Sequence, residues 1–150
     1  MRPTHPMRIL LTVLAYISAT FAVQALSHFV VNVEHYKSIT IMRAQPVFAL
    51  GIASMLIQGT IFALLFPAFN RSGSPIRNAI LFSWAFGLFL ASYIALAEPA
   101  KYKISSIATW SGVEALAAAI QFTFFGVLLG LIHQGSQSAG LSATSERTAG

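Results

Sequence analysis

The sequence predicts an all-α integral membrane protein, a four-helix bundle whose consecutive spans run antiparallel. Apolar residues make up 56% of the 150 residues, charged residues make up only 9%, and the mean hydropathy is +0.72. A soluble domain carries about 25% charged residues, because water must wet its surface. Nine basic and four acidic side chains are too few to cover a soluble surface of this size.

Four apolar stretches are each long enough to cross a bilayer, which takes about 20 helical residues. They run from about residues 9 to 29, 46 to 66, 76 to 97 and 104 to 132, within one domain of residues 1–133. Their uniform apolar character lacks the alternation of a membrane barrel. The connections are short, so we expect sequential helices to be antiparallel neighbours.

Prolines and composition suggest where these helices end. Pro46 suits a first helical turn, where its missing N–H costs nothing, and Pro67 is expected to end the second helix. Glu98-Pro99 closes the third span. Residues 134–150 are small and polar without an apolar period, which predicts a disordered tail.

The first span allows a second interpretation. Arg2 and Arg8 precede the apolar run, and small residues around Ala25 resemble a signal peptidase site. Cleavage after Ala25 would leave three spans. The run is long for a signal peptide and continues to Val31, which favours an uncleaved first span.

Lysine and arginine in short loops set the orientation of a membrane protein. Four such residues lie on each side, namely Arg2, Arg8, Arg71 and Arg77 against Lys37, Arg43, Lys101 and Lys103. We expect both termini in the cytoplasm, at the inner (plasma) membrane, and the near tie leaves insertion in both orientations as the alternative. The net charge of +5 predicts contact with anionic headgroups of the lipid bilayer and not with nucleic acid.

The chain lacks the residues that several classes of enzyme and cofactor-binding protein need. The chain has no cysteine and no aspartate, and no GxSxG or HExxH motif occurs, so we expect no catalytic residues and no cofactor. Histidines and carboxylates can bind metals, but no HxxxH, HxxE or ExxH pair holds them together, so we expect no metal site. His28 and His133 end antiparallel helices about 30 Å apart and cannot share a haem iron.

Small residues recur at four-residue spacing, which permits close contact between helices in lipid. The third span carries a stripe of Ser83, Gly87, Ala91 and Ala95, and the fourth carries Gly126 and Gly130. We expect these stripes to pack within the chain. Self-association through Gly126 and Gly130 is the alternative, which would give a homodimer or a larger membrane complex.

Glu114 is the one acidic residue inside an apolar span, about 10 to 15 Å along the fourth helix. Ionisable residues at such depth are costly and commonly functional. Gln121 follows one heptad later on the same face. Two environments remain open for Glu114: a water-filled cleft, or an ion pair with Lys101, Lys103 or Arg43.

Other polar residues complete the candidate site. Gln58 lies near the middle of the second span, where a glutamine serves as an interhelical hydrogen bond or as a substrate contact. His28 ends the first span, Glu34 and His35 follow it, and all three lie on the membrane face that also carries Glu114.

Several motifs resemble those of a family of small four-span bacterial membrane proteins without an established activity. The motifs are Glu34-His35-Tyr36, Arg43, Gln58-Gly59, Pro67, Ala100-Lys101, and Trp110 with Glu114. The resemblance extends to His133 and implies the four-helix fold and a bacterial inner membrane, but no mechanism. The length is also similar to that of small multidrug exporters, whose first-span glutamate is replaced by Gln24 here, so their mechanism is not carried over.

The sequence therefore predicts a small multi-pass membrane protein with a non-enzymatic structural or accessory role. The alternative is a small proton-coupled transporter or carrier that uses Glu114. An aqueous cleft around Glu114 favours the carrier, and a salt bridge favours the structural role.

Overall fold

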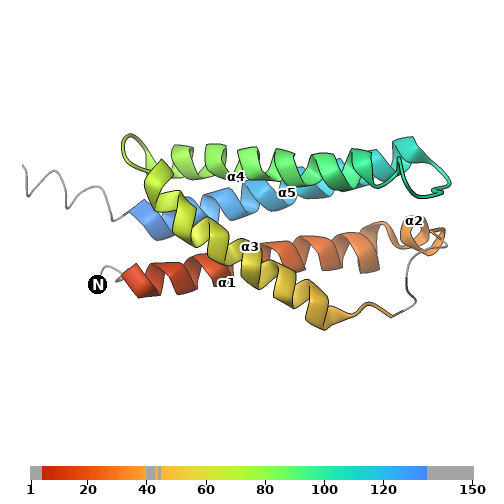
Figure 1. Cartoon of the computed structure of the whole chain (residues 1–150), viewed down its shortest axis with the longest axis horizontal. Coiled ribbons are helices and arrows are strands. Elements are labelled where there is room, and N and C mark those ends of the chain that lie inside the picture. Colours follow the sequence, from red (N-terminus) through yellow and green to blue (C-terminus); the bar gives the residue numbers. More distant parts are fainter. Residues whose placement is uncertain (1–4, 40–42, 44, 135–150) are drawn as a thin grey trace, which may run out of the picture.

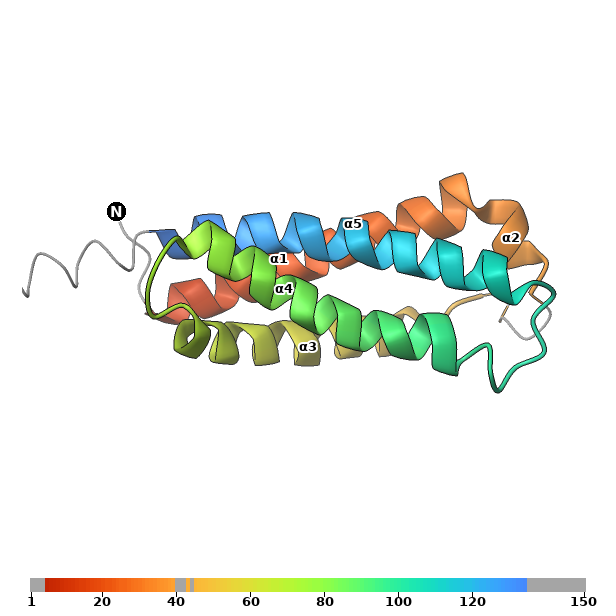
Figure 2. The ribbon, with the colours of Figure 1, turned by 90° about the horizontal axis from the view of Figure 1, so that it is seen from above.

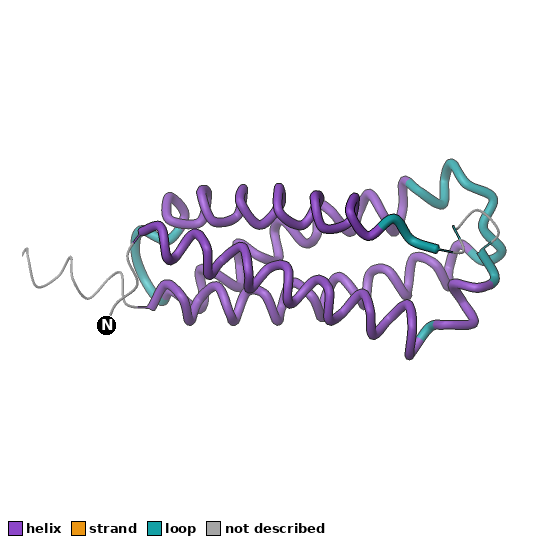
Figure 3. Tube along the Cα trace, turned by 90° about the horizontal axis from the view of Figure 1, so that it is seen from below, coloured by secondary structure: helices purple, strands orange, loops and turns teal. Residues whose placement is uncertain are grey.

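The computed structural model describes residues 5–39, 43 and 45–134, and it forms a bundle of four long helices (Figure 1). The elements are α1 (His5–Leu26) with its π-helical continuation η1 (Ser27–Val31), the short α2 (Val33–Lys37), α3 (Phe48–Phe69), α4 (Pro75–Ser92) with its π-helical continuation η2 (Tyr93–Ala97), and α5 (Ile107–His133). The described part contains no strand, and its loops gather at the two ends of the bundle (Figure 3).

Four helices are long and apolar enough to cross a membrane, which confirms the predicted all-α, four-span fold. They extend over His5–Val31, Phe48–Phe69, Pro75–Ala97 and Ile107–His133. Their outward side chains are largely apolar, as contact with lipid requires. Of the predicted tail, residues 134–150, only Gln134 is among the described residues.

Two expectations about prolines are corrected. Pro46 precedes α3 and does not lie in its first turn, because a turn in which the Phe48 N–H donates to the Pro46 carbonyl at 3.2 Å comes first. Pro67 does not end α3, which continues to Phe69. A proline so near the end of a helix removes one hydrogen bond and leaves the final turn intact, and here the Asn70 N–H still donates to the Phe66 carbonyl at 2.9 Å.

The fourth span begins at Ile107, three residues later than predicted, because Ser106 caps it. Ser106 is extended, and its Oγ accepts a hydrogen bond from the Thr109 N–H at 3.2 Å. An N-cap serine satisfies a backbone donor that the first helical turn leaves unpaired. The residues from 104 to 106 therefore belong to the loop.

The packing order differs from the chain order (Figure 2). Helices α4 and α5 form the most extensive contact, and α1 packs against both α3 and α5. Helices α3 and α4 are consecutive but meet only over a short stretch, where Phe62 and Phe66 reach Phe82. The N-terminal end of α3 diverges from α4 and α5 (Figure 1).

Glycines of α5 bring α4 and α5 into close contact. A Cβ atom on Gly130 would lie 2.7 Å from the Ile76 Cα, and one on Gly126 would lie 3.0 Å from the Ile80 Cα. Ser83 adds a hydrogen bond from its Oγ to the Phe122 carbonyl at 2.6 Å. Gly126 and Gly130 thus pack within the chain, as predicted, and are not open to a second copy.

Two apolar clusters occupy opposite ends of the interior. The larger one is centred on Tyr16, whose ring contacts those of Phe62 at 4.8 Å and Phe125 at 5.0 Å. The smaller one joins Tyr36, Ile39 and Trp110. A layer of polar side chains lies between these clusters and forms the candidate site.

We expect Gly130→Ala to destabilise the bundle, because the added methyl group meets the α4 backbone, which cannot give way cheaply. Overpacking of this kind costs about 1–3 kcal/mol. The measurement is the melting temperature in detergent. Gly112→Ala is the matched control on the same helix, since a Cβ atom at Gly112 meets nothing within 4 Å. Equal melting of both variants would show that α4 and α5 are not held this closely.

Candidate functional site

The polar layer joins α1 to α5 through Gln121. The Gln121 Nε2 donates to the Thr20 Oγ1 at 3.0 Å, and the Gln121 Oε1 accepts from the Gln24 Nε2 at 3.1 Å. Gln121 and Glu114 are both buried, so the predicted common face of these two residues is directed into the bundle. The Gln121 amide thus bonds to two side chains of α1, which compensates for its burial among apolar helices.

Among the described residues, Glu114 has a phenol as its partner and no cation at ion-pair distance. It is 8% exposed, and its Oε1 accepts a hydrogen bond from the Tyr36 OH at 2.8 Å. The one salt bridge among the described residues joins Lys37 to Glu34. Lys101 instead contacts Tyr93, with its Nζ 3.3 Å from the phenol oxygen and 4.8 Å from the ring centroid.

Of the two environments left open for Glu114, the ion pair with Lys101, Lys103 or Arg43 is therefore absent among the described residues. These cations lie in the loops, which keep their long side chains towards water, whereas Glu114 lies two turns inside α5.

Tyr36 is the partner that sequence reasoning missed. Helix α2 folds back over the end of α1 and stacks the Tyr36 ring on His28, with centroids 3.6 Å apart. Burial raises the pKa of Tyr36, and its acceptor Glu114 raises it further, so the phenol stays protonated and donates at neutral pH. The available signal was the position of Tyr36, beside His35 on the membrane face shared with Glu114.

His35 and Glu34, which were predicted to share the membrane face of Glu114, lie in different environments. The His35 ring lies beside Tyr36 at 5.2 Å and Trp110 at 6.2 Å, and its Nε2 is buried without a hydrogen-bond partner among the described residues. Glu34 is exposed and pairs with Lys37, so the structure places it outside the cluster.

An inner cavity of about 130 Å³ brings three of the predicted residues together from α3 and α5. Its polar lining consists of Tyr16, Thr20, Gln24, Gln58, Glu114 and Gln121. Gln58 accepts from the Tyr16 OH at 2.5 Å and donates to the Ser54 Oγ at 3.2 Å. The interhelical hydrogen bond predicted for Gln58 is thus present, and the same side chain faces the cavity.

A larger lateral pocket of about 410 Å³ lies between α1 with η1 and the diverging N-terminal half of α3. Its walls are mostly apolar, with Phe21, Phe29 and Ile52 among them. Thr20, Gln24 and Gln58 line both the lateral pocket and the inner cavity, so these three side chains form the partition between the two spaces. His28 also lines the lateral pocket.

This arrangement can bind a proton, a compact cation or a small hydrogen-bonding group beside Glu114. Within the described residues, no group of three or more metal-ligating side chains is close enough to hold a metal ion. The chemistry on offer is therefore that of one carboxyl group, three amides and the hydroxyl groups that surround them.

No family model, curated protein or solved structure matches the chain. The resemblance to small four-span bacterial membrane proteins therefore stays a prediction, based on the quoted motifs.

Glu98, which follows η2, gives a pH-dependent prediction. Burial raises the pKa of Glu98, and the nearby Lys101 opposes this shift. A raised folded-state pKa means that ionised Glu98 lowers stability once pH exceeds the unfolded value of about 4.3. We expect Glu98→Gln to melt above wild type at pH 7, with the gap closing as pH falls towards 4. The measurement is the melting temperature of wild type and variant in detergent between pH 4 and 7, with Glu34→Gln as control. A difference in melting temperature that widens at low pH would contradict the prediction.

Proposed function

We propose that the protein is a small proton-coupled carrier of the bacterial inner membrane, in which Glu114 exchanges a proton for a compact organic cation. The observation that carries this proposal is the environment of Glu114. Its carboxyl group is buried, has no cation at ion-pair distance among the described residues, and faces a cavity lined by amides and hydroxyl groups.

The coupling follows from the cost of a buried charge. An ionised carboxylate away from water is strongly unfavourable unless a cation or several hydrogen bonds compensate it. In the described part of the chain, Glu114 receives one hydrogen bond, from Tyr36. A proton and a ligand cation each satisfy the same carboxyl group, and they exclude each other, so binding of one releases the other.

The lateral pocket supports a route for a ligand with an apolar portion. Its apolar walls suit a hydrocarbon or aromatic group that enters from the lipid, and its inner end meets the partition of Thr20, Gln24 and Gln58. A cationic head that passes this partition reaches the cavity of Glu114. The ligand class is therefore an amphipathic amine or quaternary ammonium ion.

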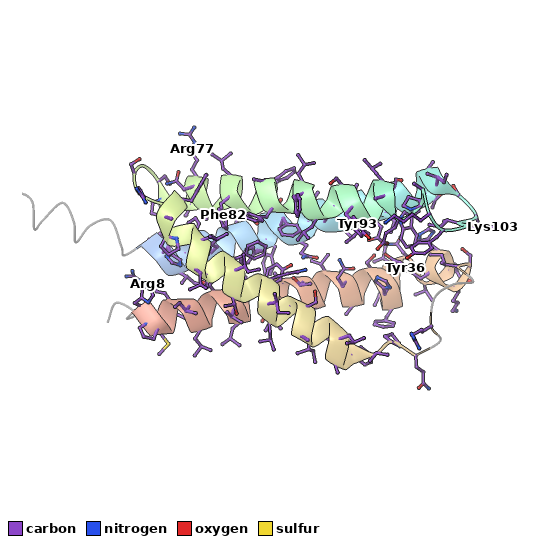
Figure 4. The ribbon with its side chains drawn as sticks, viewed as in Figure 1. Arg8, Tyr36, Arg77, Phe82, Tyr93 and Lys103 are labelled. Atoms are coloured by element: carbon purple, nitrogen blue, oxygen red, sulfur yellow. The ribbon has the colours of Figure 1, made fainter. Side chains whose placement is uncertain are left out.

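The opposite side of Glu114 supports a route for the proton. Tyr36 lies between Glu114 and the membrane face and can relay a proton through its hydroxyl group. His35 and Glu98 both lie close enough to interact electrostatically with Glu114. Figure 4 places Tyr36 at the end of the bundle that also carries Tyr93 and Lys103.

Two π-helical segments provide places where this half of the bundle can change shape. The η1 and η2 segments end the first and third spans, and π-helical turns often occur at functional sites. α5 holds η2 through hydrogen bonds from Trp110 Nε1 to the Ile94 carbonyl at 2.9 Å and from Ser111 Oγ to the Ala95 carbonyl at 2.6 Å. Ile94 also lines the inner cavity, so a change of shape in η2 would alter the wall of that cavity.

A structural or accessory role is the second candidate. The observation that favours it is the hydrogen-bond network itself, because Tyr36 and Glu114 join α2 to α5, and Gln121 joins α5 to α1. In that role Glu114 stabilises the bundle and binds no ligand.

Glu114→Gln separates the two candidates, since the amide is nearly isosteric and can still accept from Tyr36. The probe is benzyltrimethylammonium, titrated by calorimetry into the protein in detergent between pH 5 and 8. For a carrier, wild type binds with proton release and loses up to about tenfold in affinity per pH unit on acidification, as one competing proton requires. The variant keeps its melting temperature and loses the binding.

Glu34→Gln is the matched control, because it removes one carboxylate from the same membrane face but outside the cavity. It should bind as wild type does. Absence of binding and proton release in wild type would overturn the carrier. If wild type shows no binding and Glu114→Leu, which removes the acceptor of the Tyr36 hydroxyl group, lowers the free energy of unfolding by about 1–3 kcal/mol, the structural role is favoured.

For this carrier we also propose an orientation, in which both termini face the cytoplasm. The measurement uses a fluorescent protein, which is active in the cytoplasm, and alkaline phosphatase, which is active in the periplasm. After His133 only the fluorescent protein should be active, and between α4 and α5 only alkaline phosphatase should be active. A periplasmic signal alone after His133 would refute this orientation, and signals on both sides would indicate dual insertion.

A further inference from the structure

The end of the bundle far from Glu114 holds a second cavity, of about 130 Å³, between the start of α1 and the end of α5. Three basic side chains line it: His5 and Arg8 from the first turn of α1, and His133 from the last turn of α5. His5 and Arg8 lie close enough to His133 to interact with it electrostatically. Asn70, at the end of α3, completes the polar lining.

This cluster has no carboxylate to balance it within the described residues. The described acidic residues are Glu34, Glu98 and Glu114, and all three belong to the opposite half of the bundle. Two further cations, Arg71 and Arg77, lie at the basic end on the α3–α4 side. Figure 4 shows Arg8 and Arg77 at this end, far from Tyr36 and Lys103.

The donors in the cavity are incompletely used. The Arg8 Nε is buried and has no hydrogen-bond partner among the described residues. His133 is 4% exposed, and its one hydrogen-bonding contact within the described residues is a long one, 3.4 Å from Nε2 to the Thr12 Oγ1. A buried guanidinium donor without an acceptor is costly, and an anion in the cavity would supply that acceptor.

We propose that the cavity formed by His5, Arg8 and His133 binds a phosphate group. A guanidinium group matches the geometry of phosphate oxygens and binds two of them at once. His5 and His133 add imidazole groups, which can donate ring N–H hydrogen bonds, to the lining of the same cavity. The site lies at the ends of α1, α3 and α5, where both an anionic phospholipid headgroup and a free phosphate can reach it.

The test measures stabilisation of the detergent-purified full chain at constant pH and ionic strength. Phosphatidylglycerol and phosphatidylcholine are added in mixed micelles, and inorganic phosphate is compared with chloride. We expect phosphatidylglycerol or phosphate to raise the melting temperature of wild type. Arg8→Gln should shift the half-saturating concentration upward by about tenfold, the effect of losing one charge-assisted contact.

Arg77→Gln is the matched control, because Arg77 is exposed at the same end, carries the same charge and does not line the cavity. It should respond as wild type does. His133→Gln gives a second reading of the same site should Arg8→Gln fail to fold. Stabilisation by phosphatidylglycerol alone identifies the ligand as a lipid headgroup, and stabilisation by inorganic phosphate identifies it as a free anion. Either result supports the site. No stabilisation by either, or an equal loss in Arg77→Gln, would overturn it.

Discussion

Hydrocarbon offers no hydrogen-bond partners, and this constraint decides how the polar residues of the bundle are arranged. Gln121 satisfies its amide with Thr20 and Gln24, and Gln58 satisfies its own with Tyr16 and Ser54. These bonds explain why α1 packs against α5 as well as against α3, although α5 is the last long helix of the chain. Among the described residues, Glu114 has one hydrogen-bond partner, Tyr36, whereas Gln121 and Gln58 each have two.

The two halves of the bundle differ in how tightly α3 is held. At the basic end, Phe62 and Phe66 interlock with Phe82, and aromatic pairs of this kind are favourable beyond the area they bury. At the other end α3 has no such contact with α4, and the lateral pocket opens between α3 and α1. The position of one aromatic cluster thus determines which half of the molecule is closed and which is accessible from lipid.

Hydropathy and helical spacing sufficed to predict the four spans and the common face of Glu114 and Gln121, because both properties are local. The placement of Glu34 was not predictable in this way. The helix breaks after Val31 and restarts in α2, which changes the direction of later side chains and leaves Glu34 in water. The contact between Tyr36 and Glu114 joins residues 78 apart in the chain, and that of Thr12 with His133 spans 121, so only the packing of helices reveals them.

The depth of Glu114 within α5 has an electrical consequence. It lies seven residues after Ile107, about 10 Å into a helix about 40 Å long. A full elementary charge that crosses a membrane gains or loses about 2.3 kcal/mol per 100 mV. A proton that travels from the α2 end to Glu114 crosses about a quarter of the membrane, so about 0.6 kcal/mol per 100 mV acts on it. Protonation of this carboxyl group from that end is therefore weakly voltage-dependent.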